Sequence, residues 1–505
     1  MNLFKPIDLE LAAFVLGKGE NGDVFQLVAY LTAALRQGYS FIKIGQILDP
    51  SPNTLAEEDS PLSAEESAVL GSVLLKGMEK LRLECPSALV LEEERLSFEL
   101  YHSLHKKFKD LYSKHLITPP RISIDQIKLK ELIEELQQTG VITFEQGDAI
   151  YKGCTQSITL ISGGPGTGKT YTAGVLLALF WRLIAEVPCK IVLAAPTGKA
   201  AANLQKSFSK FANSLPGLQD VQATTLHALL RLGGKRELKP LDADLILIDE
   251  SSMIDTKRMV ALMEAVKPGT RIIFMGDPYQ LPPVEVGGLF AELIQAGSAG
   301  SLLTKCQRTD LAAIVEMAQA ILEGRGDNVI LNTQIEPFLE EALAEYTPPE
   351  NATIEELLNF FSKYRILSPV NRGAWGCETI NAQLFTKLTR EKQEAIVPIM
   401  VTKNDRTLNL NNGDVGILVG GSAYFSGVEV RKIPAIALAE YTLAYCLSVH
   451  KSQGSEFDKV LLLWPEGAER FGRPGLYTGV TRAKKRVDLV CAPETFKKTL
   501  LGRDT

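Results

Sequence analysis

The feature that most constrains this chain is a glycine-rich turn set between an apolar run and a helical pattern. The apolar run covers residues 158–161, and the helical pattern begins at about residue 171. A strand, a glycine-rich loop ending in Gly-Lys-Thr and a helix together make a P-loop, whose backbone N–H groups and helix N-terminus attract phosphate. The sequence therefore predicts a nucleotide site that includes Gly163, Gly164, Pro165, Gly166, Thr167, Gly168, Lys169 and Thr170.

Five side chains carry the chemistry expected of such a site. Lys169 would reach the β- and γ-phosphates, and Thr170 would offer its hydroxyl to Mg²⁺. Asp249 and Glu250 directly follow another apolar run, so Asp249 can hold Mg²⁺ through its water shell and Glu250 can polarise an attacking water. Gln280 follows a third run and could sense the γ-phosphate, although a proline-rich turn is the plainer interpretation of that segment alone.

Composition excludes several classes of protein. The 505 residues suggest three or four domains, and a net charge of −6 argues against a generally basic coat protein for nucleic acid, while a local basic groove stays compatible with it. The seven cysteines stand far apart without a Cys-x-x-Cys, which favours a reducing compartment over a disulfide framework or a zinc site. We find no signal peptide and no apolar run that could span a bilayer, and we expect a cytoplasmic protein without membrane association.

The first 120 residues differ in pattern from the rest of the chain. They predict a separate, mostly helical unit with a hairpin at about 88–100. His102 and His105 stand three residues apart without cysteine neighbours, so a solvated helix face is a better interpretation than a metal site. Because no residue of this unit carries recognisable chemistry, docking to a partner or a structural role is its expected function.

From about residue 126, short apolar runs alternate with helical patterns. The predicted strands cover 158–161, 190–194, 245–248 and 271–275, and then 365–367, 444–449, 459–463 and 486–490. Such alternation implies parallel sheets covered on both faces by helices. Two similar α/β units in one chain predict tandem motor domains, over 126–305 and 306–505, with a cleft between them.

Further segments complete a specific set of motifs in a fixed order. They are LAAPTGKAAA at 193–202, ATTLHALL at 223–230, DESSMID at 249–255, VHKSQGSEFD at 449–458 and YTGVTRAKKR at 477–486. With the P-loop segment ISGGPGTGKT, they resemble the motifs of superfamily 1 helicases of the 5′→3′ branch, and most of all the RecD family, the alpha subunits of exodeoxyribonuclease V. The resemblance covers about 140–495. It implies an α/β fold of two tandem RecA-like domains, with a small β-barrel as a candidate insertion at about 405–440.

The resemblance also implies residue roles. Gln146 would read adenine, Gly454 and Glu456 would contribute to nucleotide binding, and Asp249 and Glu250 would form the Walker B pair. Gln280 would couple to the γ-phosphate, and Arg308 and Arg482 would be arginine fingers from the second motor domain. Cations supplied across a cleft stabilise the transition state and tie hydrolysis to closure of the cleft. The path of single-stranded DNA would be lined by Pro196, Thr197, Thr225, His227, Ser448 and His450.

The implied activity is an ATP- and Mg²⁺-dependent 5′→3′ DNA helicase that acts on single- and double-stranded DNA ends. A RecB-like partner would carry the nuclease, and a RecC-like partner would dock the first unit. Two departures from the family pattern stand out. Gln307 occupies a position that is aromatic in the family, and residues 233–236 allow only a small hairpin where relatives can carry a strand-separating pin. An autonomous helicase and a structural subunit with a regulatory nucleotide site therefore remain alternatives.

Overall fold

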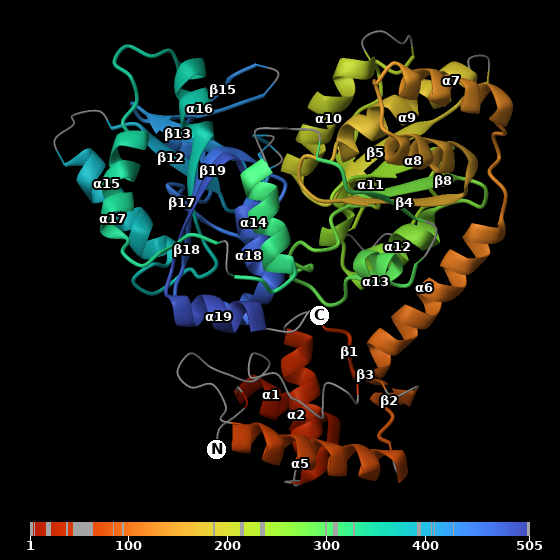
Figure 1. Cartoon of the computed structure of the whole chain (residues 1–505), viewed down its shortest axis with the longest axis horizontal. Coiled ribbons are helices and arrows are strands. Elements are labelled where there is room, and N and C mark those ends of the chain that lie inside the picture. Colours follow the sequence, from red (N-terminus) through yellow and green to blue (C-terminus); the bar gives the residue numbers. More distant parts are fainter. Residues whose placement is uncertain are drawn as a thin grey trace.

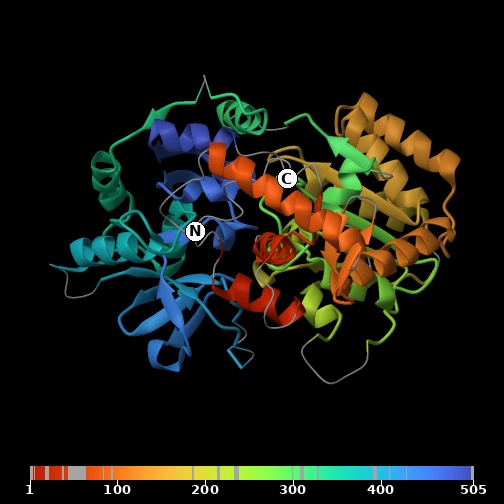
Figure 2. The same cartoon turned by 90° about the horizontal axis from the view of Figure 1, so that it is seen from below.

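The structure, a computed structural model, describes residues 4, 6–16, 22–36, 39–43, 64–83, 85–92, 95–184, 187–212, 217–232, 238–297, 300–306, 312–326, 329–390, 395–405, 407–408, 410–427 and 429–501. These residues form two parallel sheets, two antiparallel sheets and the helices that cover them (Figure 1). The two parallel sheets lie side by side. The N-terminal region lies across both of them, as the view from below shows (Figure 2).

The first parallel sheet has six strands in the order β6-β5-β7-β8-β4-β9. Their bounds are β4 (Ile158–Gly163), β5 (Ile191–Ala195), β6 (Ala223–Thr225), β7 (Leu245–Ile248), β8 (Arg271–Gly276) and β9 (Gly300–Leu303). Four of the strands match the predicted runs to within two residues at either end. Their apolar side chains are buried on both faces, as a parallel sheet covered by helices requires.

Helices cover both faces of this first sheet. One hydrophobic core joins it to α7 (Gln126–Gln138), α8 (Phe144–Thr155), α9 (Lys169–Leu183) and α10 (Gly198–Ala212). A second core joins the opposite face to α6 (Glu99–Ile117), α11 (Leu226–Leu229), α12 (Thr256–Ala265) and α13 (Leu289–Gln295). The short helix η1 (Ser251–Met253) follows β7.

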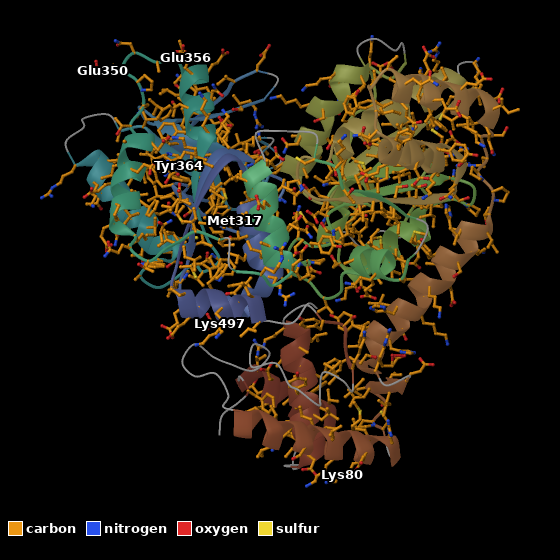
Figure 3. The ribbon with its side chains drawn as sticks, viewed as in Figure 1. Lys80, Met317, Glu350, Glu356, Tyr364 and Lys497 are labelled. Atoms are coloured by element: carbon orange, nitrogen blue, oxygen red, sulfur yellow. The ribbon has the colours of Figure 1, made fainter. Side chains whose placement is uncertain are left out.

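The second parallel sheet has five strands in the order β10-β19-β18-β11-β17. Their bounds are β10 (Leu331–Asn332), β11 (Tyr364–Ser368), β17 (Cys446–Ser448), β18 (Phe457–Trp464) and β19 (Ala483–Cys491). One core contains α15 (Glu336–Glu345), α16 (Ile354–Lys363) and α17 (Cys377–Thr389), and the other contains α14 (Ala312–Leu322), α18 (Gly472–Val480) and α19 (Pro493–Leu501). Tyr364 lies inside this region (Figure 3). Its ring packs edge-on against that of Tyr346, with 5.2 Å between ring centroids. Two parallel sheets of this kind are consistent with tandem RecA-like domains.

An antiparallel sheet is inserted into the second region. Its strands are β12 (Val397–Val401), β13 (Val415–Val419), β14 (Ser422–Phe425), β15 (Arg431–Pro434) and β16 (Tyr441–Leu443), in the order β15-β14-β13-β12-β16. Within the described ranges no pairing joins β15 to β16, so the sheet is open and the expected β-barrel is not observed. The insertion also begins before residue 405, because the apolar strand β12 shares the core of α15, α16 and α17. The short helices η3 (Ala435–Ala437), η4 (His450–Ser452) and η5 (Ala468–Phe471) lie in its last turn and in the loops that follow.

The N-terminal region has a core of its own. It contains α1 (Pro6–Leu16), α2 (Asp23–Arg36), α5 (Ala64–Leu83) and a three-stranded antiparallel sheet. The predicted hairpin is confirmed as β2 (Leu89–Glu92) paired with β3 (Arg95–Phe98), and β1 (Phe41–Lys43) adds a third strand. No helix in the described ranges is long and apolar enough to cross a bilayer.

Helix α6 joins the N-terminal region to the first parallel sheet. Phe108 and Tyr112 of this helix are buried in the core with α12, and a ring nitrogen of His115 lies 2.7 Å from the carbonyl oxygen of Thr270. His105 lies 2.9 Å from the Ser40 hydroxyl, and burial lowers the pKa of His105 to about 4. The expectation of a solvated face was therefore wrong for His105, because the N-terminal region covers it.

Candidate functional site

The P-loop follows β4 and is shaped by its glycines. Gly166 and Gly168 have φ of +71° and +83°, a left-handed conformation that glycine adopts without strain, and α9 begins at the next residue, Lys169. A Cβ on Gly163 would lie 2.7 Å from the Thr167 hydroxyl and 2.8 Å from the Leu303 carbonyl oxygen. The loop therefore turns tightly enough to direct backbone N–H groups and the start of α9 toward one place.

Lys169 is held against this loop. Its Nζ donates hydrogen bonds to the carbonyl oxygens of Gly163, at 2.5 Å, and Gly164, at 2.9 Å. The Thr167 hydroxyl donates to the same Gly164 oxygen at 2.9 Å. A lysine ammonium carries three donors, so it can exchange carbonyl acceptors for the stronger oxygen acceptors of a phosphate.

The two acids lie on the same edge of the sheet as the P-loop. The strand β8 pairs with both β4 and β7, and in a parallel sheet the carboxyl ends of all three strands meet at one edge. Asp249 Oδ1 accepts a hydrogen bond of 2.8 Å from the Glu250 backbone N–H. Glu250 has φ of +52°, an uncommon conformation for a residue with a side chain, and such strain occurs most often at functional sites.

The electrostatics of the acids connect them to both parallel-sheet regions. Burial, with the Asp249 carboxylate next to it, raises the pKa of Glu250 to about 7, although Arg482 and Lys169 partly oppose this. Burial also raises the pKa of Asp249, against the hydrogen bond from Glu250 and the charge of Lys169. Because Arg482 belongs to the second region, the acids of the first region already lie within electrostatic reach of the second.

Arg482 is anchored from its own region. Only 4% of it is exposed, and its guanidinium donates to the carbonyl oxygens of Thr478 at 3.1 Å and Ser455 at 3.3 Å. The other expected arginine finger, Arg308, lies outside the described residues, as do residues 233–236, where a pin was considered.

Gly454 and Glu456 lie in the loop before β18. The Gly454 carbonyl oxygen accepts a 2.6 Å hydrogen bond from Asn203 of α10, which directly joins the two regions. Glu456 faces Lys484 at 3.5 Å.

A cavity of about 1850 Å³ unites these groups. Its walls include expected nucleotide-site residues of the first region, namely Gln146, Gly164, Pro165, Gly166, Gly168, Lys169, Thr170, Asp249, Glu250 and Gln280, and Gly454, Glu456 and Arg482 of the second. Gly163 and Thr167 shape the loop behind that wall. Lys199, whose role the sequence did not reveal, also lines the cavity. Burial, Arg365 and Arg482 lower its pKa to about 8.

Gln146 has a local structural role beside its expected one. It is 3% exposed and forms the capping box of α8, because its side chain accepts from the Thr143 N–H at 3.0 Å while its own N–H donates to the Thr143 hydroxyl. Its amide nitrogen lies 3.5 Å from the Thr167 carbonyl oxygen. The Thr-x-x-Gln pattern signals such a box in the sequence. The residue therefore fixes the start of α8 against the P-loop as well as lining the cavity.

The expected DNA contacts fall into two groups outside the cavity wall. Pro196 and Thr197 follow β5, and Thr225 is the last residue of β6. Thr225 pairs with Ala195, the last residue of β5, so Pro196, Thr197 and Thr225 lie at the same edge of the sheet. Thr225 caps α11, and His227 of that helix is exposed.

The second group lies at the corresponding edge of the second sheet. Ser448 ends β17, and His450 packs edge-on against Phe471, 5.8 Å between ring centroids. Each parallel sheet thus presents one group at the carboxyl ends of its strands.

The oxygen atoms near the P-loop suit a hard divalent cation such as Mg²⁺. The described residues contain no group of three or more His, Cys, Asp or Glu side chains that could hold a metal by themselves. Thr170 and Asp249 both line the cavity and offer oxygen atoms there. Mg²⁺ takes few protein ligands and completes its shell with phosphate oxygens and water. The site therefore has the donor set that Mg²⁺ with a nucleoside triphosphate requires.

Comparison with known proteins agrees with this arrangement. Residues 142–341 match the family model described as "AAA domain", and residues 443–490 match the "UvrD-like helicase C-terminal domain". The RecBCD enzyme subunit RecD of Mycolicibacterium smegmatis is 34% identical over 391 residues, which cover 69% of this chain and 71% of that protein. The ATP-dependent RecD2 DNA helicase of Deinococcus radiodurans is 28% identical over 86% of this chain and 57% of that protein.

Among solved structures, Pif1 helicase from Bacteroides in complex with ADP-AlF3 and ssDNA aligns with a TM-score of 0.41 and 17% identity, over 74% of this chain and 95% of that chain. The two family models match one parallel-sheet region each in the main, and the RecD subunit of Mycolicibacterium smegmatis is more than 30% identical over more than two thirds of its own length. On these grounds the chain belongs to the RecD family of superfamily 1 and is an ATP-dependent DNA helicase.

Proposed function

We propose that the chain is the 5′→3′ motor subunit of a RecBCD-type exodeoxyribonuclease V, which acts on double-stranded DNA ends in recombinational break repair. The motor domains would cover 126–305 and 306–505, and residues 1–120 would dock on a RecC-like partner. The observation that carries the motor assignment is the cavity shared by Lys169 and Glu250 of the first region and Arg482 of the second. A ligand that contacts both regions favours their closed arrangement, and its hydrolysis releases them.

Each residue of the cavity has a role in this cycle. Lys169 would exchange the Gly163 and Gly164 carbonyl oxygens for the β- and γ-phosphates. Glu250 would polarise the attacking water, because its raised pKa makes it a stronger base than an ordinary carboxylate. Arg482 would neutralise the charge that develops on the γ-phosphate in the transition state.

Thr170 and Asp249 would hold Mg²⁺. When bound, this ion neutralises phosphate charge and orients the β- and γ-phosphates. Asp249 suits that position because its half-buried carboxylate lines the cavity next to the P-loop and accepts a hydrogen bond from the Glu250 backbone N–H.

Movement along DNA follows from the two edge groups. Pro196, Thr197, Thr225 and His227 would grip the strand from the first domain, and Ser448 and His450 would grip it from the second. Closing and opening of the cavity changes the spacing of the two grips, and alternating grip then advances the strand. The 5′→3′ direction is carried over from the RecD family.

The comparisons favour a partner-dependent subunit over an autonomous helicase. The RecBCD subunit of Mycolicibacterium smegmatis is the more similar of the two relatives, at 34% against 28% identity, and this chain covers 71% of it against 57% of the RecD2 helicase. The N-terminal region supports docking because it has its own core and carries exposed apolar side chains, among them Phe14 at 84% exposure. The RecB-like partner would supply the nuclease.

The variant Lys169→Gln tests the motor assignment. It removes the ammonium from the P-loop, so DNA-stimulated ATP hydrolysis by the native complex should fall at least about 100-fold while the complex still assembles. Lys206→Gln on α10 is the control, because it removes a lysine from the outer wall of the same cavity. If the Lys169→Gln complex hydrolysed ATP as fast as the wild type, the result would instead favour a structural subunit with a regulatory nucleotide site.

Two measurements test the choice of subunit and the direction. Affinity capture of the native chain should recover two further chains in equal amounts, and the complex should unwind from a single-stranded tail with a free 5′ end. Efficient unwinding of a 5′-tailed duplex by the isolated chain would support the autonomous alternative.

A further inference from the structure

A chain of hydrogen bonds crosses from the second region to Gln280. The Tyr477 hydroxyl of α18 donates to Asp277 Oδ2 at 2.8 Å. The same Asp277 oxygen accepts from the Gln280 side-chain amide at 3.3 Å. Tyr477, Asp277 and Gln280 are all buried, at 3%, 1% and 9% exposure, so water does not compete for these bonds.

Tyr477 keeps its proton and therefore remains a donor. Burial, and then the Asp277 carboxylate, raises the pKa of the Tyr477 hydroxyl well above its ordinary value. The hydroxyl also lies close to the P-loop, since a Cβ on Gly164 would approach it to 3.1 Å. A residue of the second region thus reaches the inner wall of the nucleotide site.

Gln280 has one acceptor left after this contact. Its Oε1 is buried and has no hydrogen-bond partner among the described residues, and Gln280 lines the cavity beside Glu250. An amide whose N–H₂ is held by Asp277 has a fixed orientation, because the two ends of the amide cannot exchange places without breaking that bond. The acceptor oxygen is then available to orient a water molecule near the γ-phosphate.

The loop that carries Asp277 and Gln280 is also clamped by the second region. The Leu281 N–H donates to the Thr478 hydroxyl at 2.8 Å, and the Leu281 carbonyl oxygen accepts from the Gln453 amide at 3.2 Å. The Leu281 side chain is 4% exposed and packs in the hydrophobic core of α18 and β18. The position of this loop therefore depends on where the second region stands.

We propose that Tyr477 is a positioning residue that orients Gln280 for hydrolysis by acting through Asp277. Docking of the second domain supplies the Tyr477 hydroxyl to Asp277 at the same time as it brings Arg482 to the phosphates. Hydrolysis then requires a docked second domain for two separate reasons, a cation for the transition state and a fixed Gln280. This inference rests on the proposed function, because it refines the hydrolytic step of the same site.

The variant Tyr477→Phe removes the hydroxyl and keeps the ring that packs edge-on against Tyr279. A lost hydrogen bond to a buried carboxylate should lower kcat for DNA-stimulated ATP hydrolysis about tenfold. The KM for ATP should stay within about twofold, since Lys169 and the P-loop are unchanged. Tyr279→Phe is the matched control, because Tyr279 is 49% exposed and its hydroxyl forms no hydrogen bond to another residue in the described part of the chain.

A double-mutant cycle separates positioning from a general structural effect. If Tyr477 acts through Gln280, Tyr477→Phe should lower kcat by no more than about twofold when Gln280 is already alanine. A full tenfold loss in the Gln280→Ala background would overturn the inference. Asp277→Asn weakens the same chain of hydrogen bonds from the first domain. If Tyr477→Phe folds poorly, Asp277→Asn can replace it, and it should show the same loss of kcat alone and the same small loss in the Gln280→Ala background.

The same assay distinguishes this inference from the proposed function. Wild-type turnover no faster than that of Lys169→Gln would overturn both. An active wild type with normal kcat in both Tyr477→Phe and Asp277→Asn would overturn only the role of Tyr477. Loss of kcat in Tyr279→Phe equal to that in Tyr477→Phe would also contradict it, because a hydroxyl that does not bond to Asp277 would then matter as much as one that does.

Discussion

The two parallel-sheet regions share one architecture but present different chemistry at the same place. In the first, β4 is followed by the tight loop 164–168, and α9 opens with Lys169 and Thr170. In the second, β11 is followed by the longer loop 369–376, and α17 opens with Cys377 and Glu378. A helix that lacks the lysine and has an acid in its first turn is a poor site for a triphosphate, because the acid opposes the partial positive charge of the helix N-terminus. The second region therefore contributes to the cavity of the first instead of building a nucleotide site of its own.

This difference separates binding from hydrolysis. Lys169, Thr170 and Asp249 belong to the first region and would hold the nucleotide there. Arg482 and Tyr477 belong to the second region and reach the phosphates or Gln280 only when the two regions meet. A ligand that one half of a cavity binds, and that is hydrolysed only with groups from the other half, makes turnover report the position of the domains, which is what a motor requires.

Among variants that test this separation of binding from hydrolysis, Arg482→Ala should have the largest effect. It removes the cation supplied across the cavity, so kcat for ATP hydrolysis should fall about 10³-fold while the Kd for a nonhydrolysable ATP analogue changes much less. Steady-state turnover and equilibrium binding of the analogue measure the two quantities separately.

The control for Arg482 stands four residues along the same motif. Arg486 is more exposed and is paired with Glu341 at 2.8 Å and with Asp488 at 2.8 Å, away from the cavity wall. Arg486→Ala should keep kcat near the wild-type value. Weakened analogue binding with little change in kcat for Arg482→Ala would show that this arginine holds the ground state, contrary to the division of roles.

The sequence specifies the first half of the cavity more fully than the second. Continuous apolar runs, each followed by glycine or acidic residues, predict β4, β7 and β8. Parallel strands buried on both faces are apolar at every position, so they are easy to recognise in the sequence. The P-loop, Asp249 and Glu250 follow directly from those strands. The second half consists of side chains that come from separate turns, and only the resemblance to a helicase family pointed to Arg482.

What the sequence could not predict depends on contacts between distant segments. Leu281 lies in a proline-rich turn, where no periodicity shows that its side chain enters the core of the other region. The role of Tyr477 depends on a partner 200 residues away, Asp277. The strand β12 at Val397–Val401 was missed because the inserted sheet was expected to begin at about 405, and the fold joins that strand to the core of α16.

A tenfold effect is expected from pH. The pKa of Glu250 is raised to about 7, and the base must be unprotonated, so activity is present above this pH and is lost as the pH falls through it. Between pH 8 and pH 6, kcat/KM for ATP should therefore fall about tenfold. Because kcat/KM also reports titration of ATP, analogue binding is measured over the same range. A profile that stays flat after that correction would show that Glu250 does not limit turnover as a base.

The smallest expected effect concerns the direct link between the regions. Asn203 of α10 donates to the Gly454 carbonyl oxygen at 2.6 Å, and Gly454 follows Ser448 and His450, the residues proposed to contact DNA. Asn203→Ala should lower DNA-stimulated kcat about three- to fivefold, the value of one partly exposed hydrogen bond. The hydrolysis measured without DNA should change less, because the link joins the grips and supplies no group to the phosphates.

Ser209→Ala is the control for this last variant. Ser209 lies on the same helix, and its hydroxyl donates to the Gln205 carbonyl oxygen within the first region, at 2.8 Å. If the two regions communicate through α10, only Asn203→Ala should reduce the ratio of DNA-stimulated to basal turnover. Equal reductions in both variants would mean that α10 responds to general loosening, and the coupling would then have to run mainly through the loop that carries Gln280 and Leu281.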